Sequence, residues 1–514
     1  NLCVTKEMKT AYDRCKARVE QIIEDCSRKR LNSRCIIFSD LEFDLEEDRD
    51  ACLYGLERDA TCRPPDVLRV TDIFRRPEPV LFKEGATADD LVQGQLQDCW
   101  FLAALATVCT ASKDSNWIEE KICVKHDVQA GVYGFIFYRD SGWVDVIVDD
   151  LLFIHAPKYE NLQEEEQNRF QRDKDQYNQV ARSGSKSLYF ASSGTEGETW
   201  VPLIEKAFAK LHGDYAALNY GFTCDAVESL TGGVYNCFHL HDILDKDKFW
   251  KEELMKLSDE VNKDKAKKDR VFSCLIASPS CDEDKLMLVR GLKPEHAYSI
   301  IDAIEHASTG KRFVKIRNPW GRGGEWNGPW SDGSREWTTK WPVPNTEEQV
   351  HIRAEDLHHT FGDDGQFIME YDDFITTWSY VDRTKLFNDE WAYSSHWLNV
   401  STRPSPSAWS PGDVSFSITI VEDTPAVIVL SQLDDRAFQE LSGCYKWSLD
   451  FVVHKQGPGK EEIGRSVHER LWRRSINLEL QNLAKGTYIV HVRLFDSSPL
   501  VYLTQRIGKV GSKT

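Results

Sequence analysis

The sequence predicts an α+β protein in which a mixed helix-and-strand core is followed by an all-β domain. Three observations support this fold class. Helix-like and strand-like patterns are mixed through roughly the first 385 residues. After about residue 386, short strand-like runs alternate with turn residues. The 514 residues also exceed the roughly 250–300 at which one hydrophobic core stops growing, so several domains are expected.

The predicted elements of the first part differ in character. Residues 8–26 carry apolar side chains at alternating steps of four and three, which predicts an amphipathic helix. The acidic run at 40–50 predicts a solvated loop. Residues 131–154 alternate aromatic or β-branched residues with others and predict strands, whereas the polar stretch at 157–197 predicts a long surface insertion. Apolar spacing over 249–261 predicts another helix.

The last part of the chain predicts a β-sandwich of roughly 130 residues, because short strands recur between turn residues. The strand-like segments are 414–421, 426–433, 449–454, 476–480 and 488–495.

Composition excludes some functions. The chain is 41% hydrophobic and 29% charged, which excludes a mostly disordered protein. Its 64 Lys and Arg against 83 Asp and Glu give a net charge of −19, which argues against nucleic acid as a partner because phosphate is repelled.

Cysteine usage and hydropathy predict the compartment. The 14 cysteines are scattered without any C-x-x-C pair, which excludes a paired-cysteine zinc ribbon and favours reduced thiols. The longest uncharged apolar stretch, residues 99–112, is too short to span a bilayer. No signal-peptide pattern opens the sequence. We therefore expect a cytoplasmic protein.

Cys99 has the surroundings of a nucleophile. It follows Asp98 and begins an apolar helix-like run, so unpaired N–H groups and the helix dipole favour a thiolate there. Gln93 stands six residues earlier, where its amide can donate to a developing oxyanion. Taken alone, these residues favour a buried structural cysteine over a nucleophile.

Two further motifs supply partners for a thiol. In GLKPEHAYSI (291–300), His296 follows a turn and precedes a strand-like run, so it can take the thiol proton and return it to a leaving amine. In RNPWG (317–321), Asn318 can hold the imidazole in one tautomer. A structural histidine and a turn asparagine are the alternatives for each residue alone.

Together with QGQLQDCWFLAAL (93–105), these strings resemble the active-site motifs of calpains, the calcium-dependent papain-like cysteine proteases. The resemblance covers roughly residues 65–512 and stops short of a calmodulin-like EF-hand domain. It implies a triad of Cys99, His296 and Asn318 with Gln93 in the oxyanion hole, and a gating role for Trp320 as a wedge. Calpains carry glycine before the histidine, where this chain has Glu295.

The resemblance also implies a fold and its boundaries. It implies a papain-like two-lobed cysteine protease core followed by an all-β C2-like sandwich. The expected parts are an N-terminal segment (1–64), a Cys lobe (65–220), a His/Asn lobe (221–384) and the sandwich (385–514).

Calcium is the cofactor that the resemblance implies, although the sequence has no EF-hand loop. The first implied site uses Lys83, Gly85, Asp90 and Glu198. The second uses Glu325, Asp332, Gly362, Asp364 and Gln366. Calpains usually carry glutamate where Gln366 stands, and a neutral ligand predicts a weaker second site.

The expected function is calcium-activated intracellular cysteine endopeptidase activity, with limited proteolysis of protein substrates. Two alternatives remain: a catalytically impaired calpain-like scaffold or regulatory protein, and a transglutaminase-type acyltransferase. The latter uses an Asp as third member, against which Asn318 argues. Acidic loops at 422–423 and 434–435 of the sandwich suggest calcium, phospholipid or membrane contact.

Overall fold

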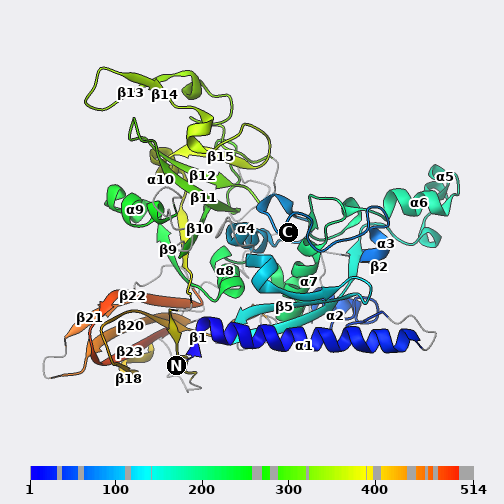
Figure 1. Ribbon diagram of the computed structural model, residues 1–514, viewed down its shortest axis with the longest axis horizontal. Coiled ribbons are helices and arrows are strands. Elements are labelled where there is room, and N and C mark those ends of the chain that lie inside the picture. The colour runs from blue at the N-terminus through cyan, green and yellow to red at the C-terminus, as the bar shows by residue number, and fades with distance from the viewer. Residues whose placement is uncertain are drawn as a thin grey trace, which may run out of the picture. The chain divides into compact units, whose positions relative to one another are not determined.

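Helices and strands are mixed through the first three quarters of the chain, and the elements described after residue 391 are strands (Figure 1). The chain divides into two units, Asn1–Gly233 with Cys237–Tyr393, and Val234–Asn236 with Ser394–Thr514. The predicted mixture of helix and sheet is therefore confirmed. The computed structural model describes residues 2–31, 37–55, 63–109, 117–140, 142–257, 269–277, 288–319, 323–388, 390–397, 407–436, 447–457, 461–466 and 473–496.

Unit one has a first part, Asn1–Gly233, and a second part, Cys237–Tyr393. A three-stranded antiparallel sheet forms the centre of the first part. Its order is β4 (Cys123–Asp127), β5 (Val132–Arg139) and β6 (Gly142–Asp149). All residues of β5 except the last are buried, so both of its faces must be covered. Helix α1 (Val4–Leu31) covers one side, and α7 (Trp200–His212) and α8 (Thr223–Thr231) lie on the other (Figure 1). The predicted N-terminal helix and these strands are confirmed.

A glycine lets α1 approach the sheet closely. Cys15 and Val19 of α1 are fully buried against Gly134 of β5. A Cβ atom at Gly134 would lie 2.7 Å from Val19 Cγ2 and 2.8 Å from Cys15 Sγ. The absence of a side chain therefore sets the distance between helix and strand.

The acidic run at residues 40–50 is only partly solvated, contrary to the sequence prediction. Asp40 is 4% exposed, and both of its carboxylate oxygens accept from Lys210 Nζ at 2.8 Å. Phe43 and Leu45 are buried in the core, and α2 (Arg49–Tyr54) begins within the run. Apolar residues interleaved with the charges direct this segment inward.

The polar stretch at 157–197 contains two short helices, α5 (Glu164–Arg169) and α6 (Lys174–Ala181). Their residues are mostly exposed, as expected of a surface insertion. The stretch turns inward after residue 186, where most side chains up to 193 are buried. The surface prediction is therefore wrong for that last part.

Other short elements complete this part of unit one. They are α3 (Val70–Ile73) and the strand pairs β1 (Leu2–Cys3) with β17 (Ala392–Tyr393), β2 (Asp66–Arg69) with β7 (Leu151–Ile154), and β3 (Leu91–Val92) with β8 (Ser192–Ser193).

A six-stranded antiparallel sheet organises the second part of unit one, together with α9 (Lys246–Glu252) and α10 (Tyr371–Thr377). The helix predicted over 249–261 ends at Glu252, and a single 3-10 turn follows at Leu254–Lys256; residues 258–261 lie outside the described chain. The strand order is β15 (Gln366–Glu370), β12 (Arg312–Arg317), β11 (Ala297–Glu305), β10 (Arg270–Leu275), β16 (Tyr380–Lys385) and β9 (Val234–His239).

Helix α4 (Cys99–Cys109) joins the two parts of unit one. Its residues from Trp100 to Val108 are all buried, and it packs on β10, β11 and α8. The hydroxyls of Thr107 and Ser299 lie 2.8 Å apart, and both donate to the Ala103 carbonyl. These polar groups are thus satisfied inside an apolar contact. The helix predicted after Cys99 is confirmed.

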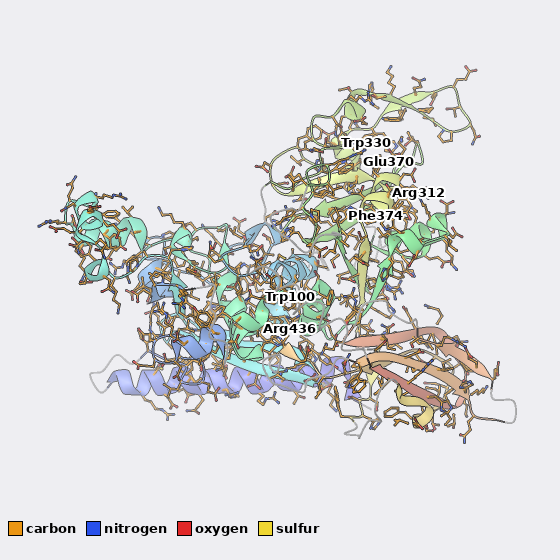
Figure 2. All side chains as sticks on the ribbon, turned by 180° about the vertical axis from the view of Figure 1, so that it is seen from behind. Trp100, Arg312, Trp330, Glu370, Phe374 and Arg436 are labelled. Atoms are coloured by element: carbon orange, nitrogen blue, oxygen red, sulfur yellow. The ribbon has the colours of Figure 1, made fainter. Side chains whose placement is uncertain are left out.

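A tryptophan-rich segment extends from the six-stranded sheet and includes the hairpin of β13 (Lys340–Pro342) and β14 (Gln349–His351). Trp330 and Glu370 are labelled close together in Figure 2. The indole N–H of Trp330 donates to Glu370 Oε2 at 3.1 Å, and Lys311 Nζ lies 2.5 Å from Oε1. These contacts anchor the segment to β12 and β15.

Unit two consists of antiparallel strands that share one apolar core. The five predicted strands are confirmed. Within the described residues, no helix combines the length and apolarity needed to cross a membrane. One sheet has the order β18 (Ser407–Ile420), β23 (Gly486–Asp496), β20 (Trp447–Lys455) and β21 (Glu462–Arg465), and the other pairs β19 (Thr424–Ser431) with β22 (Ser475–Leu483).

Candidate active site

The thiol of Cys99 lies at the first residue of α4, where the two parts of unit one meet. The backbone N–H groups of Trp100 and Ala297 both donate toward it. Ala297 begins β11 and directly follows His296. The fold therefore brings the predicted nucleophile beside the backbone of the predicted base, although they are far apart in sequence.

The protonation of Cys99 differs from the sequence prediction. Burial, followed by the charge of Asp98, raises the pKa of the Cys99 thiol to about 11. The prediction that the helix N-terminus favours a thiolate is therefore wrong for this arrangement. The loss of hydration outweighs the two N–H donors, because burial disfavours the charged form.

Alkylation of Cys99 by iodoacetamide without calcium is expected to rise about tenfold per pH unit between pH 7 and pH 9. The reason is that only the thiolate reacts, and a pKa of about 11 keeps its fraction small at these values. Mass spectrometry of the Cys99 peptide measures the rate, with the fully buried Cys15 as an unreactive control. A plateau below pH 9 would contradict the expectation.

His296 and Asn318 form a buried pair. His296 Nε2 lies 2.9 Å from Asn318 Oδ1, and the two residues are 2% and 0% exposed. Asn318 is held in turn by its amide, which donates to the Gly323 carbonyl at 2.8 Å. Burial lowers the pKa of His296 to about 4, so the imidazole is neutral near pH 7 and able to accept a proton.

Glu295, which stands where calpains carry glycine, has a φ of +53°. This left-handed region favours glycine, so the backbone keeps a conformation that the side chain makes more costly. Glu295 and Ala297 line a cavity of about 40 Å³ together with Cys99, Phe222 and Cys274. The predicted nucleophile therefore faces a space bounded by both parts of unit one.

Gln93 lies seven residues before Trp100, in a loop before α4. Its Nε2 donates to the Leu96 carbonyl at 2.8 Å. This bond holds the Gln93 side chain against the loop that precedes α4. Trp320, the predicted gate, lies outside the described residues.

Three residues of the first predicted calcium set, Lys83, Asp90 and Glu198, contact one another. Glu198 is 1% exposed, and its two oxygens accept from the Lys83 N–H at 2.9 Å and the Ser193 hydroxyl at 2.6 Å. Burial, and then the adjacent Asp90 carboxyl, raise the pKa of Glu198. Gly85 provides a turn with a φ of +86°. Among the described residues no Lys or Arg pairs with either carboxyl, so this acidic pair fits a cation that prefers oxygen ligands.

Members of the second predicted set contact one another through backbone N–H groups. Burial, with the charges of Asp332 and Asp364 among the smaller causes, raises the pKa of Glu325. Asp332 Oδ2 accepts the Gly362 N–H at 2.8 Å, and Asp364 Oδ1 accepts the Gln366 N–H at 2.9 Å. The loop at 362–366 thus directs N–H groups toward three carboxylates, those of Asp332, Glu325 and Asp364.

Two residues near this set were missed in the sequence. His359 Nε2 lies 2.7 Å from Asp332 Oδ1, and Asp363 accepts the Gly323 N–H at 2.8 Å. Only the adjacency of Asp363 to Asp364 could have indicated the second of these. Both Asp332 oxygens therefore have partners, as both Glu198 oxygens do in the first set. Among the described residues, no three His, Cys, Asp or Glu side chains are grouped to hold a metal by themselves, so backbone carbonyls would be needed.

Residues 38–173 and 175–385 match the family model described as calpain family cysteine protease. The chain belongs to the calpain family. The match includes all three motifs and lies within the span of unit one, apart from residues 234–236.

Named calpains from several animals show the same similarity. Human calpain-9 is 29% identical over 416 residues, which are 77% of this chain and 52% of that protein. Calpain-A of Drosophila melanogaster is 34% identical over 330 residues, 62% of this chain and 33% of its own length. Calpain clp-4 of Caenorhabditis elegans is 31% identical over 362 residues, which are 67% of this chain and 43% of that protein. The chain thus spans a third to about half of these calpains.

Proposed function

We propose that this chain is a calcium-activated cysteine endopeptidase that performs limited proteolysis of protein substrates. The observation that carries the proposal is the buried 2.9 Å contact between His296 and Asn318 beside the thiol of Cys99. A neutral imidazole with one nitrogen fixed by an amide oxygen is suited to accept a thiol proton.

Each residue then has one role. Cys99 attacks the peptide carbonyl, and His296 takes its proton and later protonates the leaving amine. Asn318 fixes the orientation of the imidazole. Gln93 and the backbone N–H of Cys99 donate to the oxyanion.

Calcium would be held by Asp90 and Glu198 with backbone carbonyls of Lys83 and Gly85, and more weakly by the set at Glu325. It would supply positive charge to carboxylates that otherwise repel each other. Arg317 Nε lies 3.0 Å from Asp89 Oδ1, which joins the residue before Asn318 to the residue before Asp90. This contact supports the proposal that calcium binding reaches the triad.

The nine described cysteines are free thiols, which supports an intracellular, reducing compartment for this activity. Contact of the sandwich with phospholipid is a further proposal. Asp423 accepts the Lys485 N–H at 2.8 Å, so part of this loop is already engaged in a turn.

The test compares the full chain with Cys99→Ser on casein, with millimolar calcium or with a chelator. Calcium-dependent cleavage by the wild type and none by the variant are expected. Cleavage that survives the substitution would refute the nucleophile, and cleavage indifferent to the chelator would refute calcium activation. An inert wild type that binds calcium would favour the scaffold alternative.

The double variant Asp90→Asn/Glu198→Gln is expected to lose most of the rise in Tm that calcium gives the wild type. Specific binding at a hundred times Kd stabilises by about 2.7 kcal/mol, and the variant removes both charges of the first set. Differential scanning fluorimetry with and without calcium measures the shift. Glu84→Gln, an exposed neighbour, is the matched control. An undiminished shift in the double variant would contradict the assignment.

A further inference from the structure

Two buried carboxyl groups lie behind Cys99 and take no part in the proposed triad. Asp98 is 0% exposed and directly precedes Cys99. Its backbone carbonyl accepts the N–H groups of Phe101 at 2.8 Å and Leu102 at 3.2 Å, which closes the first turn of α4. Glu205 is 1% exposed on α7.

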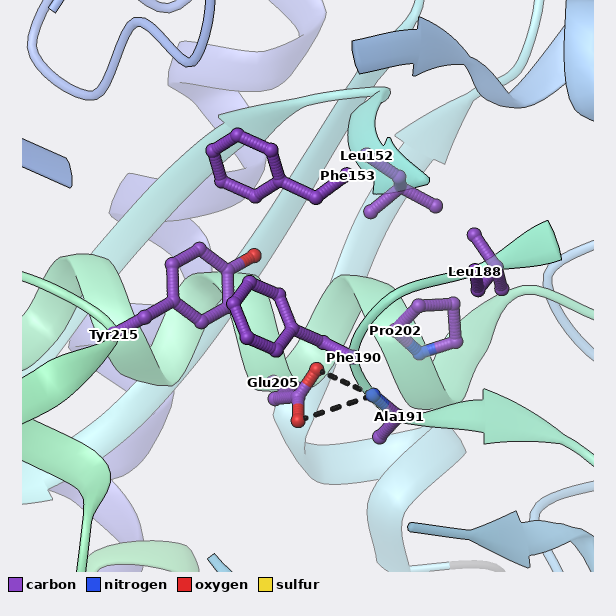
Figure 3. Close-up of a pocket in the computed structure, with 8 residues that line it drawn as sticks. All are labelled: Leu152, Phe153, Leu188, Phe190, Ala191, Pro202, Glu205 and Tyr215. Carbon is purple, nitrogen blue, oxygen red and sulfur yellow. Dashed lines mark hydrogen bonds between the residues drawn. The ribbon is translucent and has the colours of Figure 1, made fainter. Parts of the chain in front are cut away.

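The side chains of Asp98 and Glu205 are in hydrogen-bond contact with each other. Apart from the backbone N–H of Asp98 itself, no N–H or hydroxyl group of the described residues donates to either oxygen of Asp98. Both oxygens of Glu205 accept the Ala191 N–H, at 3.2 and 3.0 Å (Figure 3). Because two ionised carboxylates repel each other in a dry site, this contact requires a proton between them.

Among the described residues, no cation replaces that proton. The neighbouring Lys206 is engaged with Asp149, 2.5 Å from its Oδ1. Glu205 also lines a cavity of about 10 Å³, together with Phe190, Tyr215 and other residues (Figure 3).

The titratable groups that face the pair do not neutralise it either. Cys99 lies on one side, and its thiol pKa is raised by burial and by Asp98. Tyr215 lies near both carboxyls, and burial and Glu205 raise its pKa well above the usual value. Burial raises the pKa of Asp98 to about 7, and that of Glu205 further above its ordinary range. The pair therefore keeps at least one proton near neutral pH.

We propose that Asp98 and Glu205 share one proton and act as a single positioning unit for Cys99, holding the first turn of α4 against α7. The shared proton links Asp98, the residue next to the thiol, to a helix that begins 102 residues later, at Trp200. The role of Cys99 as nucleophile rests on the proposed function, whereas the shared proton does not.

Two variants of Glu205 separate the effect of its hydrogen bond to Asp98 from the effect of its side-chain volume. Glu205→Gln keeps a hydrogen-bond donor to Asp98, and its amide does not titrate. Glu205→Leu has similar volume but no donor. At pH 7.5 we expect kcat within about threefold of wild type for glutamine, and at least about tenfold lower for leucine with KM little changed, because Asp98 is left buried without a partner. If Glu205→Leu does not fold, the kcat values of Asp98→Asn and Asp98→Ala are compared instead, because these variants keep and remove the hydrogen-bonding group at Asp98.

The pH profile adds a readout that a merely structural role would not move. Wild-type kcat is expected to fall at alkaline pH as the shared proton leaves, and this fall should be absent in Glu205→Gln. Glu228→Gln, which removes a buried carboxyl from the helix α8 that packs on α4, should keep the wild-type profile. Equal kcat values in Glu205→Gln and Glu205→Leu would overturn the positioning role. So would a kcat of Glu205→Gln that falls at alkaline pH as the wild-type kcat does.

Infrared spectroscopy tests the proton independently of proteolysis. At pH 8 the wild type should show the carbonyl band of a protonated carboxylic acid that is missing in Glu205→Gln and retained in Glu228→Gln. No difference band would overturn the shared proton. A difference band in a wild type that cleaves no substrate would uphold the shared proton and overturn the proposed function instead.

Discussion

Replacing His296 by alanine is expected to lower kcat on a protein substrate by about 10³-fold or more, with a much smaller change in KM. In the proposed mechanism the imidazole removes the thiol proton, and the thiol pKa of about 11 means that Cys99 depends on a base near neutral pH. Steady-state kinetics at saturating calcium measure both constants.

The matched control is His306→Ala. His306 follows β11, and its Nδ1 lies 3.0 Å from the Thr309 hydroxyl in a turn away from Cys99. This variant should keep near wild-type kcat. Both proteins need a wild-type Tm for the comparison to hold. Activity of His296→Ala within tenfold of wild type would show that another group serves as the base.

Replacing Lys206 by methionine is expected to lower the free energy of unfolding of unit one by about 3–5 kcal/mol. Lys206 is fully buried on α7, and its Nζ donates to Asp149 Oδ1 at 2.5 Å and to the Leu151 carbonyl at 2.9 Å. Methionine matches the apolar stem but leaves Asp149 as an uncompensated buried charge. Denaturant unfolding followed by tryptophan fluorescence measures the loss.

Lys174→Met is the control for this second substitution. Lys174 and Glu160 form an ion pair of the same 2.5 Å length, but both side chains are more than half exposed. Solvent screens such a pair, so little change in stability is expected. Equal effects of the two substitutions would show that burial does not decide the contribution of these ion pairs.

Local patterns in the sequence predicted most elements and the candidate catalytic residues. The helix after Cys99 and the strand after His296 follow from apolar periodicity and turn residues, which act over a few positions. The five strands of unit two follow for the same reason. Placement of His296 beside Asn318 was predictable because both motifs are short and specific.

Properties that depend on distant residues were not predictable. The thiol pKa of Cys99 reflects burial under another part of the chain, which no neighbour in sequence reveals. Glu205 lies in α7, where charged residues stand among apolar ones, and its contact with Asp98 arises from packing. The hydrogen bond between His359 and Asp332 likewise joins residues that are 27 positions apart in the tryptophan-rich segment. The density of charges at 40–50 wrongly predicted a solvated loop, because Asp40 is paired with Lys210, which is 170 residues away in sequence.

Cys15 and Val19 pack against Gly134, so the N-terminal helix is an integral part of the folded protein. The region matched to the calpain family begins only at residue 38, after this helix has ended. A recombinant fragment designed to that limit, or a molecule that cut itself there, would leave the apolar face of β5 uncovered. Such a product is expected to self-associate through this exposed apolar face and to aggregate.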